Sequence, residues 1–184
     1  MLNDSLAIVW PTNFVCTIIT DQVVVSNSYS LSISIEPINT FPGSIAIGFK
    51  KLRHFVDVYL DNSVFIHKDN LLAEMLKEHD TNLVLLPTDP YDYFVGGVLY
   101  NKFLAITENN FHIDLIAIDS AIGDHIQYNI SDPEDCGLDL SGDHWWNSNT
   151  PNTGFNPDAN WDDLDINEGP KFQPRIIKGG RSEN

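Results

Sequence analysis

Tyr29-Ser-Leu-Ser-Ile-Ser-Ile35 is the stretch of sequence that decides the fold class. Apolar and small polar residues alternate in it, which predicts a strand with one face in a core and the other in solvent. Two shorter apolar runs precede it at residues 6–10 and 14–20, the first of them ended by Pro11. The N-terminal part of the chain is therefore predicted to form β-strands, and Pro37 ends this pattern.

Helical and strand patterns alternate over the next hundred or so residues. The spacing of apolar residues predicts helices at residues 44–60, 70–79 and 89–106. Short apolar or alternating runs predict strands at residues 64–66 and 83–86 and a β-hairpin near residues 111–130. The chain is therefore predicted to be an α+β protein, with N-terminal β-strands, about three helices interleaved with short strands, and this hairpin.

The second predicted helix is expected to begin after a cap at Asp69. Its apolar residues recur at helical spacing, so they are expected to face inward: Leu71, Leu72, Met75 and Leu76.

The third predicted helix has the clearest start signal, because Asp89 suits an N-cap and Pro90 suits the first helical position. Gly96-Gly97 inside it costs about 2 kcal/mol relative to two alanines. We expect close packing against a strand or another backbone to offset that cost. Lys102 is expected to be exposed or covered by a partner.

The size and charge of the chain limit its domain organisation and its partners. At 184 residues, 42% of them hydrophobic, it has the length of one domain with an appendage and enough apolar residues for a core. We expect an α+β core domain at residues 1–131 and an extended, irregular arm at residues 132–184. The net charge of −16 disfavours direct nucleic-acid binding, because phosphates would be repelled. It suits a basic protein partner, metal cations or solubility alone.

The cysteines and the N-terminus indicate a compartment. Cys16 and Cys136 form no CxxC pair and are interpreted as free thiols in a reducing environment, with one disulfide as the alternative. The first residues lack the basic and apolar regions of a signal peptide, and no apolar run is long enough to span a membrane. We therefore expect a protein kept in a cytoplasm, or in a particle assembled there, without membrane contact.

The predicted arm combines segregated charge with spaced apolar side chains. From Asp132 to Glu168 it has ten acidic side chains and no Lys or Arg, and a short basic tail follows. Spaced anchors on polar linkers are typical of arms that dock on a partner. The predicted partner-binding residues are Trp145, Trp146, Phe155, Trp161, Phe172 and Ile176. For the two adjacent tryptophans, packing on the chain's own core is the alternative, and both interpretations stay open.

Two sets of residues have the composition of divalent-cation sites. Asp163, Asp165 and Asn167 place oxygen ligands at alternate positions, as calcium loops do, although Pro174 stands where a bidentate Glu is expected. A solvated acidic loop is the alternative for this set. The second set would form a carboxylate–histidine metal site on the predicted hairpin, with a polar solvent face as the alternative: His112, Asp114, Asp119, Asp124 and His125.

The stretch from Pro90 through Gly123-Asp124 to Trp145-Trp146 resembles small uncharacterised proteins of tailed bacteriophages in general texture. The resemblance covers about a third of the chain and implies no activity and no site residues. It favours particle assembly or host interference over metabolism. We therefore expect a non-catalytic interaction or assembly protein, as a phage or viral particle component that docks through residues 132–184. An acidic decoy for a host DNA-binding protein and a small metal-dependent hydrolase are the alternatives.

Overall fold

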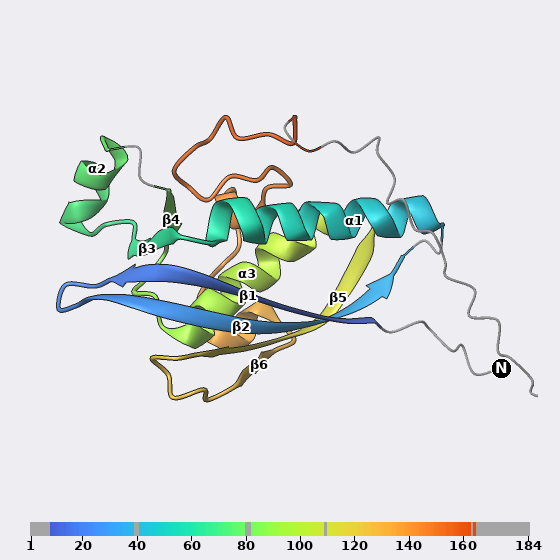
Figure 1. The fold of residues 1–184 in the computed structure, drawn as a ribbon, viewed down its shortest axis with the longest axis horizontal. Coiled ribbons are helices and arrows are strands. Elements are labelled where there is room, and N and C mark those ends of the chain that lie inside the picture. Colours follow the sequence, from blue (N-terminus) through green and yellow to red (C-terminus); the bar gives the residue numbers. More distant parts are fainter. Residues whose placement is uncertain (1–7, 39–40, 80–81, 109, 163, 165–184) are drawn as a thin grey trace, which may run out of the picture.

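A six-stranded mixed sheet is the centre of the computed structural model, which describes residues 8–38, 41–79, 82–108, 110–162 and 164 (Figure 1). In space the strands follow the order β4-β3-β1-β2-β5-β6. Parallel pairing joins β1 to β3 and β3 to β4, and antiparallel pairing joins the other neighbours. The strands are β1 (Ile8–Ile19), β2 (Val24–Pro37), β3 (Ser63–His67), β4 (Leu83–Leu86), β5 (Phe111–Ser120) and β6 (Tyr128–Ile130).

The long hairpin of β1 and β2 confirms the predicted alternation, because Tyr29, Leu31 and Ile33 are buried while the serines between them face outward. The predicted break at Pro11 is wrong, since β1 continues through it. β3 pairs only with the end of β1, from Cys16 onward, so Pro11 has a neighbouring strand on one side only. A strand tolerates proline there, because no ladder hydrogen bond is lost on the open side.

Three α-helices of the described chain match the predicted number, which completes the α+β architecture (Figure 1). α1 (Pro42–His54) passes directly into a π-helical turn, η1 (Phe55–Leu60), and together they cover the predicted range. α2 (Leu71–Lys77) connects β3 to β4. α3 (Asp92–Thr107) begins later than predicted, because Tyr91 is extended and its N–H donates to the carbonyl of Asp89.

α2 differs from its prediction in the direction of most of its apolar side chains, although Leu76 is partly buried and packs against the core as predicted. Leu71 is 94% exposed, and Leu72 and Met75 are exposed as well. The helix has only two turns, and it packs on β3 and β4 through the buried Ala73. The cap is Asn70, whose side chain accepts from the N–H of Leu72, rather than Asp69. α2 therefore presents an apolar face to solvent.

The two adjacent glycines of α3 lie where two different neighbours approach the helix. A Cβ on Gly96 would lie 2.9 Å from Ile118 of β5, and a Cβ on Gly97 would lie 2.6 Å from Cys136 Sγ. Cys136 belongs to the 3-10 turn η2 (Pro133–Cys136). The expected close packing is therefore confirmed, and α3 lies between the sheet and the segment that follows it.

Replacement of Gly97 by alanine is expected to destabilise the protein, although alanine is the better helix former. The new Cβ would push η2 away from α3, at a cost of about 1–3 kcal/mol in the free energy of unfolding. Urea denaturation measures this loss. In a double-mutant cycle with Cys136→Ala, the two losses should be strongly non-additive, because the second change removes the clashing sulfur. Additive losses would contradict the contact.

Candidate interaction site

Residues 132–162 of the predicted arm pack on the chain's own core. Trp145 is 8% exposed and Trp146 3%, both in the 3-10 turn η3 (Trp145–Asn147). The indole N–H of Trp145 donates to the carbonyl of Leu85 at 2.7 Å, and that of Trp146 donates to Leu140 at 2.9 Å. Both indoles are therefore buried within this chain, so the two tryptophans pack on the chain's own core.

The same segment covers the free edge of β4. The N–H of Leu85 donates to the carbonyl of Thr153 at 3.0 Å, and the Thr153 hydroxyl donates to the carbonyl of Leu83 at 2.5 Å. Gly154 forms a bridge with Val84. An uncovered strand edge invites pairing with another chain, so this contact closes one side of the sheet.

Lys102 fastens the segment from the other side. Its side chain is fully buried, and Nζ donates to the carbonyls of Trp145, Ser148 and Thr150 at 2.7, 2.9 and 2.6 Å. Burial lowers the pKa of the amine to about 7. The three carbonyls favour the ammonium form, which alone has three protons to donate. The expectation of an exposed or partner-covered Lys102 is therefore wrong. Its ammonium group is bound by backbone carbonyls instead of by water.

Phe155 and Trp161 also contact their own chain. Phe155 is half-buried and packs against a small hydrophobic cluster between α2 and the sheet: Ile19, Ile66, Ala73, Leu83 and Leu85. The Trp161 indole N–H donates to the carbonyl of Asn149 at 2.7 Å, and Lys51 Nζ lies 5.4 Å from the ring centroid. Burial lowers the pKa of Lys51, whose side chain joins α1 to this ring. Phe172 and Ile176 lie outside the described residues, so their role as anchors stays a prediction.

The predicted hairpin metal site separates into two pairs at opposite ends of β5. His112 Nε2 lies 3.4 Å from Asp114 Oδ1, and His125 Nδ1 lies 3.0 Å from Asp119 Oδ1. Within the described ranges, no three His, Cys, Asp or Glu side chains gather as a metal site would require, and Asp124 adds nothing to either pair. The calcium-like residues Asp163, Asp165 and Asn167 lie outside the described residues.

Both cysteines are buried free thiols. Burial, followed by the charge of Asp92, raises the pKa of Cys16 to about 12. The interpretation of Cys16 as a small hydrophobic core residue fits this environment, since a reactive cysteine needs an accessible thiolate.

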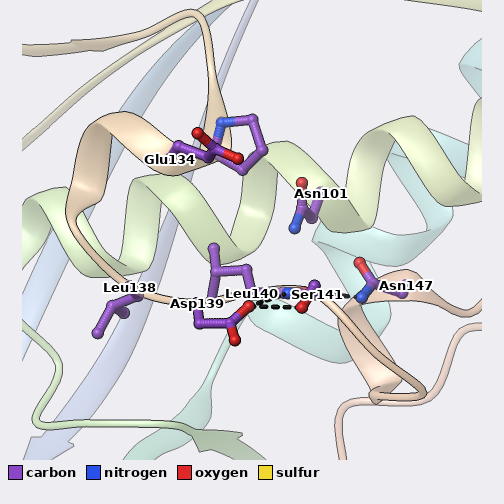
Figure 2. Close-up of a pocket in the computed structure, with 8 residues that line it drawn as sticks. Asn101, Glu134, Leu138, Asp139, Leu140, Ser141 and Asn147 are labelled. Carbon is purple, nitrogen blue, oxygen red and sulfur yellow. Dashed lines mark hydrogen bonds between the residues drawn. The ribbon is translucent and has the colours of Figure 1, made fainter.

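A cavity of about 410 Å³ lies along the seam between α3 and residues 133–147 (Figure 2). Asp139 in it accepts from the N–H and the hydroxyl of Ser141, and these two hydrogen bonds lower its pKa. Asn147 donates to the carbonyls of Leu140 and Gly142, both at 2.8 Å. The polar groups of this cavity therefore stabilise the loop that carries them.

A second groove, of about 330 Å³, lies beside the first turn of α3. Four segments line it, namely the end of β1, the start of β2, the start of α3, and the β5–β6 turn with β6. Asp92 is the only charged residue among those that line it, and the rest are mainly apolar or aromatic: Ile18, Thr20, Val23, Val25, Pro90, Tyr91, Tyr93, Ile122, Gly123 and Tyr128.

The turn between β5 and β6 forms one rim of this groove in a strained conformation. Asp124 and His125 have φ angles of 54° and 58°, in the left-handed region that non-glycine residues rarely adopt. Asn27, which is buried, holds the turn by accepting from the N–H of Ile122 at 3.1 Å. A Cβ on Gly123 would overlap the carboxylate of Asp92. Strain of this kind often marks a functional surface.

Comparison with known proteins leaves the family open. No protein-family model matches the chain, and no curated protein matches it. The resemblance of residues 90–146 to small phage proteins therefore stays a prediction. No helix in the described residues has both the length and the apolar character needed to cross a membrane.

Most of the large hydrophobic side chains that are exposed in the described residues gather at one end of the molecule, on the left of Figure 1. The β1–β2 turn lies at this end, with α2 on one side of it and the start of α3 and the β5–β6 turn on the other. Asn70 at the start of α2 donates to Asp21 of the β1–β2 turn at 3.1 Å, which joins α2 to the groove region. We call this surface the apolar end: Val23, Val24, Val25, Leu71, Leu72, Met75, Tyr91, Tyr93, Ile122, Ile126 and Tyr128.

Proposed function

We propose that this chain is a non-catalytic protein–protein interaction or assembly protein that docks through its apolar end. The observation that carries the proposal is the concentration of exposed apolar side chains on four segments at that end. Large contiguous apolar patches on soluble proteins mark interaction surfaces, because leaving them in water costs free energy. Residues 132–162 serve this function indirectly, since they complete the rigid body that carries the surface.

The partner is proposed to be another subunit of a phage or viral particle. The resemblance of residues 90–146 to small proteins of tailed bacteriophages supports this part of the proposal. From the net charge of −16 we further propose that the partner's surface is basic, because opposite charges steer association and suppress wrong partners. The basic surface would surround the apolar contact.

A matched pair of isoleucines tests the docking surface. Ile126 at the apolar end and Ile38 at the opposite end of β2 are each 59% exposed. The tagged chain, with Ile126→Asp or Ile38→Asp, is expressed in the organism that encodes it, captured, and analysed by quantitative mass spectrometry. Ile126→Asp is expected to reduce the co-purifying partner at least about tenfold, because a buried carboxylate costs more than 1.4 kcal/mol. Ile38→Asp should retain it.

The same two variants show which results would contradict the proposed docking surface. Equal recovery of every co-purifying protein with both variants would contradict docking through the apolar end. Loss with Ile38→Asp alone would move the interaction surface to the opposite end of the molecule.

A further inference from the structure

The groove in the apolar end holds a carboxylate that has no basic partner among the described residues. Asp92 Oδ2 accepts from the Ser120 hydroxyl at 2.8 Å, and Ser120 Oγ accepts from the N–H of Gly123 at 3.0 Å. The ion pairs of the described chain all lie elsewhere. Neutral groups and the N-terminal turn of α3 therefore fix the position of this carboxylate, and no ion pair among the described residues includes it.

Aromatic side chains flank this carboxylate. The ring centroids of Tyr93 and Tyr128 are 5.9 Å apart, and Tyr91 stands on the same turn, exposed to solvent. An aromatic face attracts a cation that lies within about 6 Å of its centroid, and a carboxylate strengthens the attraction through charged hydrogen bonds. One carboxylate with several tyrosines is therefore suited to bind a cationic group that is attached to an apolar molecule or chain.

The charge around the groove has one sign. No Lys, Arg or His lines it, and Asp124 adds a second carboxylate on the adjacent turn. The whole chain, at −16, attracts cations at longer range as well. An anionic or neutral occupant would leave the charge of Asp92 unpaired in a partly buried position, so charge complementarity selects a cation.

The size of the groove suits a small occupant, such as one long side chain. Its volume of about 330 Å³ lies at the lower end of the range of roughly 300–1,000 Å³ for small-molecule sites. Exposed apolar residues continue beyond it, among them Val24 and Ile126. If a partner's charged side chain enters the groove, the apolar residues next to it in the partner would therefore contact the exposed apolar residues around the groove.

We propose that the groove binds an arginine or lysine side chain that a partner protein presents between apolar residues, with the cation on Asp92. This inference rests on the proposed function and specifies the chemistry of the partner at the same surface. Arginine binds better than lysine, because its planar guanidinium stacks on tyrosine and donates two parallel hydrogen bonds to a carboxylate.

The test is a titration of the ¹⁵N-labelled full chain with acetyl-Leu-Arg-Leu-amide, followed by NMR. The matched probe is the same peptide with citrulline, which has nearly the shape of arginine without its charge. The arginine peptide is expected to shift the amide signals of Asp92, Ile122 and Gly123 and to bind at least tenfold more tightly than the citrulline peptide.

Three variants assign the effect to the groove. Asp92→Asn keeps the shape of the side chain and should weaken the arginine peptide at least tenfold. Asp124→Asn removes a charge from the adjacent turn, where asparagine is well suited to the left-handed backbone, and should change affinity less than twofold. Tyr93→Leu, which removes an aromatic face but stays apolar, should weaken the arginine peptide and leave the citrulline peptide unchanged. The amide spectrum of each variant reports whether it is folded.

The outcomes separate this inference from the proposed function. Equal binding of both peptides in the groove would overturn the cation site and leave an apolar docking surface standing. Shifts outside the groove, or none, would overturn the inference. Binding that appears only when Arg175 and Lys178 are changed to Gln would assign the groove to the chain's own C-terminal residues, which also overturns it. Failure of the proposed function would instead appear as equal recovery with Ile126→Asp and Ile38→Asp.

Discussion

Lys102→Met is expected to lower the free energy of unfolding by about 3–5 kcal/mol. The substitution keeps an unbranched apolar side chain but leaves three backbone carbonyls without their shared donor: the buried one of Trp145 and the partly buried ones of Ser148 and Thr150. Each unsatisfied group costs on the order of 1–3 kcal/mol, less what is regained by local rearrangement. Chemical denaturation of the purified chain measures the change.

Lys77→Met is the control for this substitution. Lys77 donates to Glu74 on the surface of α2 at 2.6 Å, and exposed pairs contribute at most about 1 kcal/mol. A loss of less than about 1 kcal/mol for Lys102→Met, comparable with the control, would show that the Lys102 ammonium does not hold residues 145–150 on α3.

Trp145→Ala is expected to be equally severe, with a loss of about 3–5 kcal/mol. It removes a buried indole, the hydrogen bond to the carbonyl of Leu85, and the aromatic face that lies 5.5 Å from Lys102 Nζ. The segment that covers β4 would lose its main anchor. Denaturation followed by far-UV circular dichroism, which does not depend on tryptophan emission, measures the loss.

Trp161→Ala provides the comparison, because Trp161 belongs to the same segment but is only half-buried. We expect its loss to be about 1–2 kcal/mol, since less apolar area is removed from water. If Trp145 instead served as an anchor for a partner, Trp145→Ala would leave the isolated chain as stable as the wild type, and that result would contradict the packing described here.

Local patterns in the sequence predicted those strands and helices that bury an apolar face. The alternation from Tyr29 to Ile35 predicted β2, and helical spacing predicted α1 and α3. The direction of α2 could not be predicted, because several faces of this short helix are apolar and tertiary packing selected the face with Ala73. The continuation of β1 through Pro11 depends on how far β3 extends, which is a long-range property.

The groove could not be predicted because its residues come from four separate segments. In the sequence, Asp92 suits the start of a helix and Gly123-Asp124 suits a turn, but no local pattern places the two together. Their proximity follows from the antiparallel pairing of β2 with β5, which brings Ser120 opposite Tyr29 and beneath α3. The burial of Lys102 had one sequence signal, since it is the single charged residue in the mainly apolar stretch from Phe94 to Ile106.

Site-specific photo-crosslinking in the organism that encodes the chain tests docking through the apolar end most directly. Tyr91 and Phe41 are aromatic residues at opposite ends of the molecule, 57% and 67% exposed, so p-benzoylphenylalanine can replace either with little disturbance. We predict one dominant crosslinked protein from position 91, lost in the Ile126→Asp background, and none from position 41. Crosslinking from position 41 alone, or crosslinking from position 91 that Ile126→Asp leaves unchanged, would contradict the account.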